Sequence, residues 1–143
     1  MNHTTKGMGR RTAYDDAYPT CAETYATLRI YTGEMAPQAV SAALRLKPTK
    51  LLVAGKNGSQ LNGWLLSSQT QVESRDVRRH LDWLLEQIVA AQEVLRRMQS
   101  EPDLWMDVFC YWRSTHGQGG PMLSPKQMQR LAELDLTIGF DCY

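Results

Sequence analysis

The sequence has no long hydrophobic run and few cysteines. Apolar stretches such as 51–54 and 88–91 are only four residues long, whereas a membrane-spanning helix needs roughly 18 to 20. No apolar segment follows the basic residues of positions 1–20, so the pattern of a secretory signal is missing. Three cysteines without a close pair favour a reducing compartment. We therefore expect a cytoplasmic protein in which Cys21, Cys110 and Cys142 are small buried side chains.

A strong charge of either sign is also missing. Sixteen Lys and Arg nearly balance fifteen Asp and Glu, leaving a formal charge of +1. This balance argues against a nucleic acid or an anionic membrane as the partner. The distribution is uneven, because residues 1–60 carry a net +4 and residues 61–143 a net −3. The densest basic group, Arg45, Lys47, Lys50 and Lys56, is interpreted as a solvated loop rather than a phosphate site.

Catalytic and metal-binding motifs are absent from the sequence. The histidines at positions 3, 80 and 116 are far apart, and no Cys-x-x-Cys, His-Glu-x-x-His or EF-hand spacing occurs. Ser67 and Ser68 lack the Gly-x-Ser-x-Gly turn that exposes a nucleophilic serine. We predict no catalytic residue, no metal site and no cofactor. His80 is expected to be a hydrogen-bonded residue at the edge of a helix's apolar stripe.

The length and composition fit one globular domain. With 143 residues, of which 43% are hydrophobic and 22% charged, a chain of this size buries roughly two-thirds of its unfolded surface. Residues 1–20 are polar and lack periodicity, so we predict a mobile N-terminal tail, with Tyr14 and Tyr18 docking at its end. Residues 21–143 are predicted to form a single α+β domain.

Alternating apolar and polar residues locate the strands. They predict strands at 25–32, 63–69, 104–113 and 136–143, and a short apolar run predicts another at 51–54.

Capping residues and apolar spacing locate three helices. A short helix follows Pro37, and a long amphipathic helix runs from Ser74 to Gln99 with apolar residues three and four apart. A third begins at Ser124 and Pro125, a cap and first-turn proline. The resulting βαββαβαβ order contains the split-βαβ order of ferredoxin-like folds. We predict a mixed or antiparallel sheet of about five strands with the long helix on one face.

Strand alternation separates the aliphatic from the aromatic residues. If positions 28, 30, 108, 138 and 140 face the helices, the residues between them must face the other way. Six of the twelve aromatic residues fall on this other side. Its predicted members are Tyr25, Arg29, Tyr31, Trp105, Asp107, Phe109, Tyr111, Arg113, Asp141 and Tyr143. So large an aromatic patch, with arginine, is typical of a binding site.

Several interpretations of this side are open. In the first, this side is covered by the tail, by the extra strand or by another copy of the chain, and Arg29 pairs with Asp107 or Asp141. In the second, this side recognises another protein, which includes the case of an immunity-type protein that neutralises a toxin. Alternatively, Arg29, Asp107, Tyr111 and Asp141 line the cleft of a small ligand-binding protein or enzyme. Single-stranded nucleic acid stacking on the rings is disfavoured by the near-zero charge. We favour a non-enzymatic protein-binding module, acting on a partner protein or as a homo-oligomer.

A glycine-rich loop offers one further hypothesis. Gly117, Gly119 and Gly120 precede a predicted helix, where backbone N–H groups can bind an anion. The loop lacks the lysine and serine of a phosphate-binding loop and the dinucleotide fingerprint. A flexible crossover loop is the alternative that we favour.

Four groups of residues, in this order, carry a resemblance to a known family. They are Asn62-Gly63-Trp64 leading to Ser67-Ser68, the run His80-Leu81-Asp82-Trp83-Leu84-Leu85, Gly119-Gly120-Pro121 with Leu123-Ser124-Pro125, and Phe140-Asp141 with Tyr143. Over residues 24–143 the chain resembles the bacterial family of domain of unknown function 4279. The resemblance implies a bacterial, cytosolic single domain and implies no activity, cofactor or catalytic residue.

Overall fold

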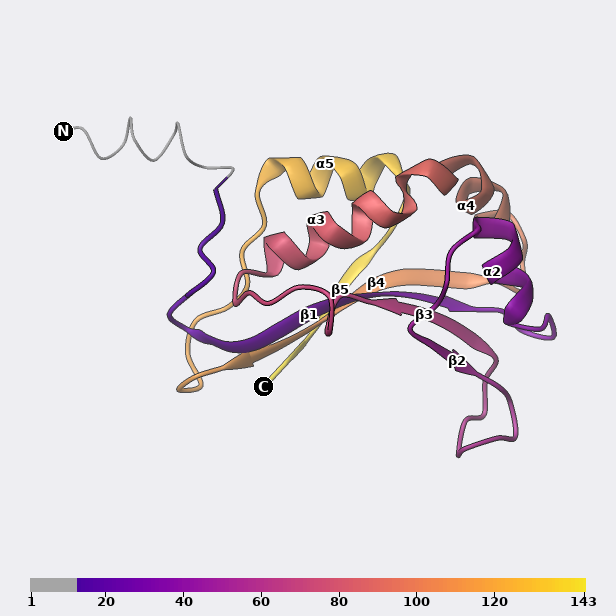
Figure 1. The fold of residues 1–143 in the computed structure, drawn as a ribbon, viewed down its shortest axis with the longest axis horizontal. Helices are drawn as coiled ribbons and strands as arrows, with labels where there is room; N and C mark the ends of the chain where they lie inside the picture. The colour runs from indigo at the N-terminus through magenta and orange to yellow at the C-terminus, as the bar shows by residue number, and fades with distance from the viewer. Residues whose placement is uncertain (1–12) are drawn as a thin grey trace.

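The computed structural model describes residues 13–143, so residues 1–12 of the predicted tail lie outside it. Five strands form one sheet in the order β2-β3-β1-β4-β5. They are β1 (Cys21–Tyr31), β2 (Lys50–Leu52), β3 (Gly63–Ser67), β4 (Trp105–Ser114) and β5 (Ile138–Cys142). The helices are α2 (Gln38–Leu44), α3 (Val77–Ile88), α4 (Gln92–Gln99) and α5 (Pro125–Glu133), with a 3-10 turn η1 (Val89–Ala91). All of these helices lie on one side of the sheet (Figure 1).

The sheet combines a split βαβ unit with a parallel extension. β3 lies between β1 and β2 and is antiparallel to both, and β1 is antiparallel to β4. This arrangement confirms the predicted α+β class and split-βαβ order. β5 then pairs with β4 in parallel, and α5 supplies the crossover that a parallel pair requires. The sheet is therefore mixed.

The long predicted helix begins later than expected and is interrupted. Asp76, not Ser74, caps it, because the Asp76 side chain accepts a hydrogen bond from the Arg78 backbone N–H. The helix ends at Ile88, and η1 separates it from α4. The apolar stripe continues across this break through Ala91. In a 3-10 turn, residues three apart lie on the same side. The three-residue step from Ile88 to Ala91 therefore keeps both residues on the apolar side in a 3-10 turn as well as in an α-helix. For this reason the spacing of apolar residues does not reveal the break in the helix.

The other boundaries agree within a few residues. Ser124 and Gln127 form a capping box ahead of α5, in which the Ser124 N–H donates to Gln127 Oε1 at 2.8 Å. α2 starts directly after Pro37. β2 covers Lys50–Leu52 rather than 51–54, since the chain turns at the glycine-rich stretch that follows.

The hydrophobic core fills the space between the helices and one side of the sheet. Its largest fully buried apolar side chains are Leu28, Ile30, Trp64, Leu81, Leu84, Leu85, Ile88, Leu95, Val40 and Val108. Cys21 and Cys110 are buried as expected, whereas Cys142 is exposed. The expectation for Cys142 was wrong because it rested on alternation alone, and this residue ends β5 at the margin of the sheet. Among residues 13–143, no helix is long and apolar enough to cross a membrane.

A buried polar bridge joins the sheet to α3. Ser68 Oγ accepts a hydrogen bond from the Ala26 N–H at 2.9 Å and lies 2.6 Å from His80 Nδ1. His80 Nε2 lies 2.9 Å from the Ser74 carbonyl oxygen. A carbonyl only accepts, so Nε2 carries the proton and Nδ1 accepts from the serine hydroxyl. His80 is only 1% exposed, deeper than the helix edge that the sequence predicted.

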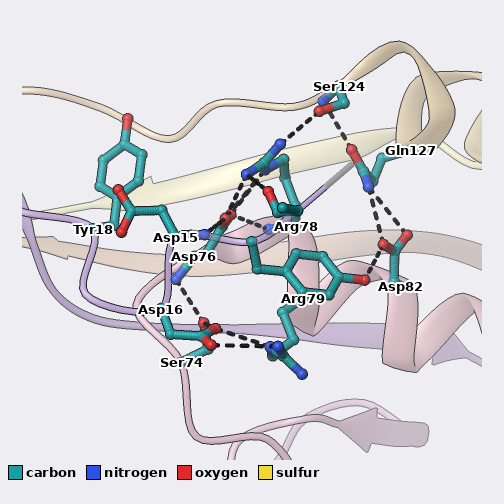
Figure 2. A network of polar contacts seen from close by, with 12 residues as sticks. Asp15, Asp16, Tyr18, Ser74, Asp76, Arg78, Arg79, Asp82, Ser124 and Gln127 are labelled. Atoms are coloured by element: carbon teal, nitrogen blue, oxygen red, sulfur yellow. Dashed lines mark hydrogen bonds and ion pairs between the residues drawn. The ribbon is translucent and has the colours of Figure 1, made fainter. Parts of the chain in front are cut away.

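Residues 13–20 contact α3 along its first turns (Figure 2). The Asp15 N–H donates to Asp76 Oδ2 at 2.8 Å, and Arg79 Nε donates to Asp16 Oδ1 at 2.9 Å. The Tyr18 hydroxyl donates to the Gly120 carbonyl at 2.9 Å. This stretch is therefore tied to both α3 and the loop before α5.

Asp82 connects three segments under this stretch. It is 5% exposed and accepts hydrogen bonds from the Tyr14 hydroxyl, from Gln127 Nε2 at 3.1 Å and from Arg130 Nη1 at 3.3 Å. Burial and the hydrogen bond to Asp82 raise the pKa of Tyr14 to about 12. Tyr14 and Tyr18 thus dock as the sequence predicted.

The buried histidine makes stability depend on pH. Burial lowers the pKa of His80 below its ordinary value of 6.5. As the pH falls through this range the unfolded chain binds a proton that the folded chain does not, so the free energy of unfolding decreases. In urea titrations at about pH 7.5 and about pH 5.5, His80→Gln should lose less stability than the wild-type chain on acidification. His116→Gln, in an exposed loop, is the matched control and should keep the wild-type difference; an unchanged difference in His80→Gln contradicts the prediction.

Candidate functional site

The side of the sheet opposite the helices carries aromatic side chains in register. Tyr25 is the partner of Tyr111 across β1 and β4, and Tyr31 is the partner of Trp105. The rings of the first pair stack at 5.1 Å between centroids and those of the second at 5.4 Å. Directly opposed residues share one face of a sheet, so the register places these rings together as the alternation predicted.

We call this surface the aromatic face. It comprises Tyr25, Arg29, Tyr31, Trp105, Asp107, Phe109, Tyr111, Asp141 and Tyr143. Tyr143 lies beyond the end of β5, with its ring 5.5 Å from that of Tyr111. Trp105 is 53% and Tyr143 65% exposed. Within residues 13–143, every helix lies on the opposite side of the sheet, so no helix covers the aromatic face (Figure 1).

Arg29 lies at the centre of this face. Its Nε and Nη2 donate to the two carboxylate oxygens of Asp107 at 2.8 and 2.7 Å. The hydrogen bonds to Asp107 raise the pKa of Arg29. The guanidinium carbon also lies 4.0 Å from the centroid of the Phe109 ring and 5.4 Å from that of Trp105. A bidentate ion pair held against aromatic rings is rigid and locally neutral.

Two strand glycines allow the rings to lie close to the sheet. A Cβ at Gly139 would lie 3.1 Å from Phe109 Cδ1, and one at Gly63 would lie 3.4 Å from Tyr31 Cδ1. Both rings therefore extend over a neighbouring strand at a position without a side chain. Such packing of an aromatic ring over a strand glycine helps to hold the register.

The two aspartates of the alternative cleft, that of a small ligand-binding protein or enzyme, are not neighbours. Asp141 is the register partner of Tyr111, four positions along β4 from Asp107, which is roughly 13 Å in a strand. Its carboxylate accepts a hydrogen bond from the Tyr143 hydroxyl at 2.9 Å. Because of this separation, the two carboxyl groups cannot share a proton as an acid and base pair.

The aromatic face is also flat. Five cavities of residues 13–143 have volumes of about 60 to 490 Å³, and no residue of the aromatic face lines any of these five. Small-molecule sites are concave. The arrangement is therefore suited to a broad partner surface rather than to a small ligand.

The other candidate residues have structural roles. Ser68 and His80 form a hydrogen-bonded pair but are 0% and 1% exposed, so substrate cannot reach them. Burial raises the pKa of the Cys110 thiol to about 12, which suppresses the reactive thiolate. His80 and His116 lie on different elements, a helix and a loop.

The glycine loop has a packing explanation. A Cβ at Gly119 would lie 2.5 Å from Thr20 Cβ, and Gly119 has a positive φ of 80°. α5 begins only at Pro125, and its first turn is satisfied by its own capping box. Gly117, Gly119 and Gly120 therefore do not lie next to an uncapped helix N-terminus. An anion site in this loop stays an untested prediction.

The sequence reasoning missed the β2 side of this surface. Lys50 is the register partner of Leu65, which is the partner of Arg29. Lys50 and Leu65 therefore lie on the same side of the sheet as the aromatic face. Alternation in β3 could have indicated this, because Trp64 is buried and its neighbour Leu65 must face the other side of the sheet. The strand is short and has apolar residues on both sides, so the alternation is hard to recognise in the sequence.

Comparison with family models identifies the family of this chain. The model of the domain of unknown function DUF4279 matches residues 22–143, so the chain belongs to this family. Comparisons with curated proteins and with solved structures give no match.

The central ion pair should stabilise the fold only as a pair. Asp107→Ala leaves a partly buried guanidinium without its acceptor and should lower the free energy of unfolding by about 3 kcal/mol. The double variant Arg29→Met with Asp107→Leu should recover most of this loss, because both replacements pack against Phe109. Glu23→Ala removes an exposed partner 3.7 Å from Arg113 and is the control, with a loss below about 0.5 kcal/mol. Urea unfolding measures the stability of all three variants; equal losses in the Asp107→Ala variant and the double variant would contradict this prediction.

Proposed function

We propose that the protein is a non-enzymatic protein-interaction module that binds its partner through the aromatic face. The observation that carries this proposal is one flat surface of six aromatic residues with an arginine at its centre, on the side opposite the helices of residues 13–143. Tryptophan, tyrosine and arginine are the residues most enriched in the energetic centres of interfaces. Large exposed aromatic patches are rare on monomers and usually mark binding surfaces.

The rigidity of the face supports the same conclusion. Stacked ring pairs lie toward both ends of the face, Tyr25 with Tyr111 and Tyr31 with Trp105, and the bidentate pair of Arg29 and Asp107 lies between them. A partner that docks on side chains already held in place loses little side-chain entropy on binding. The face is therefore organised before the partner arrives.

The charge and shape of the face favour protein over other ligands. Its central arginine is neutralised by Asp107, and no excess of positive charge surrounds it for a phosphate backbone to contact. The flat surface lacks the concavity that a small ligand needs. A neutral aromatic surface of this kind matches the buried centre of a protein interface.

Photocrosslinking tests this proposal. A photoreactive amino acid at Thr27, which faces Phe109 across β1 and β4, should form covalent adducts with a protein in the cell that makes this chain. The same amino acid at Met128, 50% exposed on α5, is the matched control. Trp105→Ala should reduce the Thr27 adducts by about tenfold. Mass spectrometry identifies the adducts, and an equal yield from both positions would count against the proposal.

A further inference from the structure

We propose that the partner on the aromatic face is a second copy of this chain, packed sheet against sheet with β2 of each copy over β5 of the other. The inference rests on the proposed function, since it names the occupant of the same face. It is argued from the charges at the two margins of the sheet and from the area that the face offers.

The two outer strands carry opposite charges. The segment 45–72, which contains β2 and β3, has four basic residues and no acidic residue. The segment 134–143, which follows α5 and contains β5, has two acidic residues, Asp135 and Asp141, and no basic residue. β2 and β5 lie at opposite edges of the sheet. One margin is therefore basic and the other acidic.

One charged residue at each margin points to the side of the aromatic face. Lys50 shares a cross-strand row with Leu65 and Arg29, and Asp141 shares one with Tyr111. The other charged residues of this side pair within one chain, Arg29 with Asp107 and Arg113 with Glu23. Lys50 and Asp141 are thus the charges of this face placed to contact another molecule at its margins.

Two copies related by a two-fold axis can satisfy both margins at once. When two sheets face each other with the axis lying obliquely in the interface, Lys50 of each copy lies over Asp141 of the other, and symmetry forms this contact twice. An arrangement that places like margins together brings two lysines or two aspartates into contact, which is unfavourable. The charges at the margins thus favour the orientation in which β2 of each copy lies over β5 of the other. The aromatic centre has no net charge, so two copies of it do not repel each other.

The available area is sufficient for a reversible dimer. The five strands contain 34 residues, which at a rise of about 3.3 Å per residue and a strand spacing of about 4.8 Å offer roughly 540 Å² of face per copy. Two copies would bury about 1,100 Å², an area typical of weak and transient interfaces. Sheets packed face to face lie about 10 Å apart, which accommodates interdigitating aromatic side chains. We therefore expect an association that depends on protein concentration and that weakens with added salt.

Complementary charge reversal tests the orientation. In Lys50→Glu the two residues that meet across the interface are both acidic, and in Asp141→Lys they are both basic, so each variant alone should dimerise at least about tenfold more weakly than the wild-type chain. An equimolar mixture should recover wild-type affinity as a heterodimer, because each reversed residue then meets its opposite. Sedimentation equilibrium measures the masses, with a fusion on one variant to distinguish mixed from self-paired dimers. Circular dichroism and thermal unfolding establish that both variants are folded.

Matched controls carry the same charge changes on the helix side. Lys126→Glu on α5 and Glu93→Lys on α4, both exposed, should leave the dimer unchanged. Trp105→Ala should weaken it. Failure of the mixture to recover dimer, open-ended polymers, or a dimer indifferent to Trp105→Ala would overturn the inference. A wild-type chain that stays monomeric up to roughly 0.5 mM would also overturn it; if Thr27 then crosslinks to a different protein, the proposed function stands while the second copy is rejected.

Discussion

The pairing of β1 with β4 is the constraint on which the rest of this structure depends. Its register runs from Glu23 opposite Arg113 to Tyr31 opposite Trp105. Because successive side chains point to opposite sides of a strand, a slip by one residue would turn Leu28, Ile30 and Val108 toward solvent and the tyrosines toward the helices. One register therefore determines both the hydrophobic core and the aromatic face. β3 and β5 join the outer sides of this pair and inherit its division into two faces.

Buried polar contacts on the helix side hold the second layer in place. Asp82 on α3 accepts hydrogen bonds from Tyr14 and from two residues of α5, and Ser68 with His80 links the sheet to α3. Among the described residues, no buried polar side-chain atom lacks a hydrogen-bond partner. Because an unpaired buried group would be costly, such a satisfied network specifies how α3, α5 and residues 13–20 pack. These groups resemble catalytic residues in kind, but their burial gives them a structural role.

The aromatic face has different properties because it is not part of that core. Its rings stack on each other and over Gly63 and Gly139, and its central charge is neutralised within the chain. The result is a flat, rigid and neutral centre, with a basic margin at β2 and an acidic margin at β5. Under the proposed function, the charges at the margins discriminate between partners, since the centre itself carries no net charge.

Much of this arrangement follows from local sequence patterns. Alternation placed Tyr25, Arg29, Trp105 and Tyr111 on one side, and Ser124-Pro125 located α5, because strand period and helix capping depend on neighbouring residues. The local pattern did not reveal the break at η1 or distinguish Asp76 from Ser74 as the cap of α3. The exposure of Cys142 and the separation of Asp107 from Asp141 were decided only by the tertiary structure. Each depends on which elements lie beside each other, and these are contacts between residues far apart in the chain. The strand order that sets a basic edge opposite an acidic one was determined in the same way, because no local pattern records which strands become the edges of a sheet.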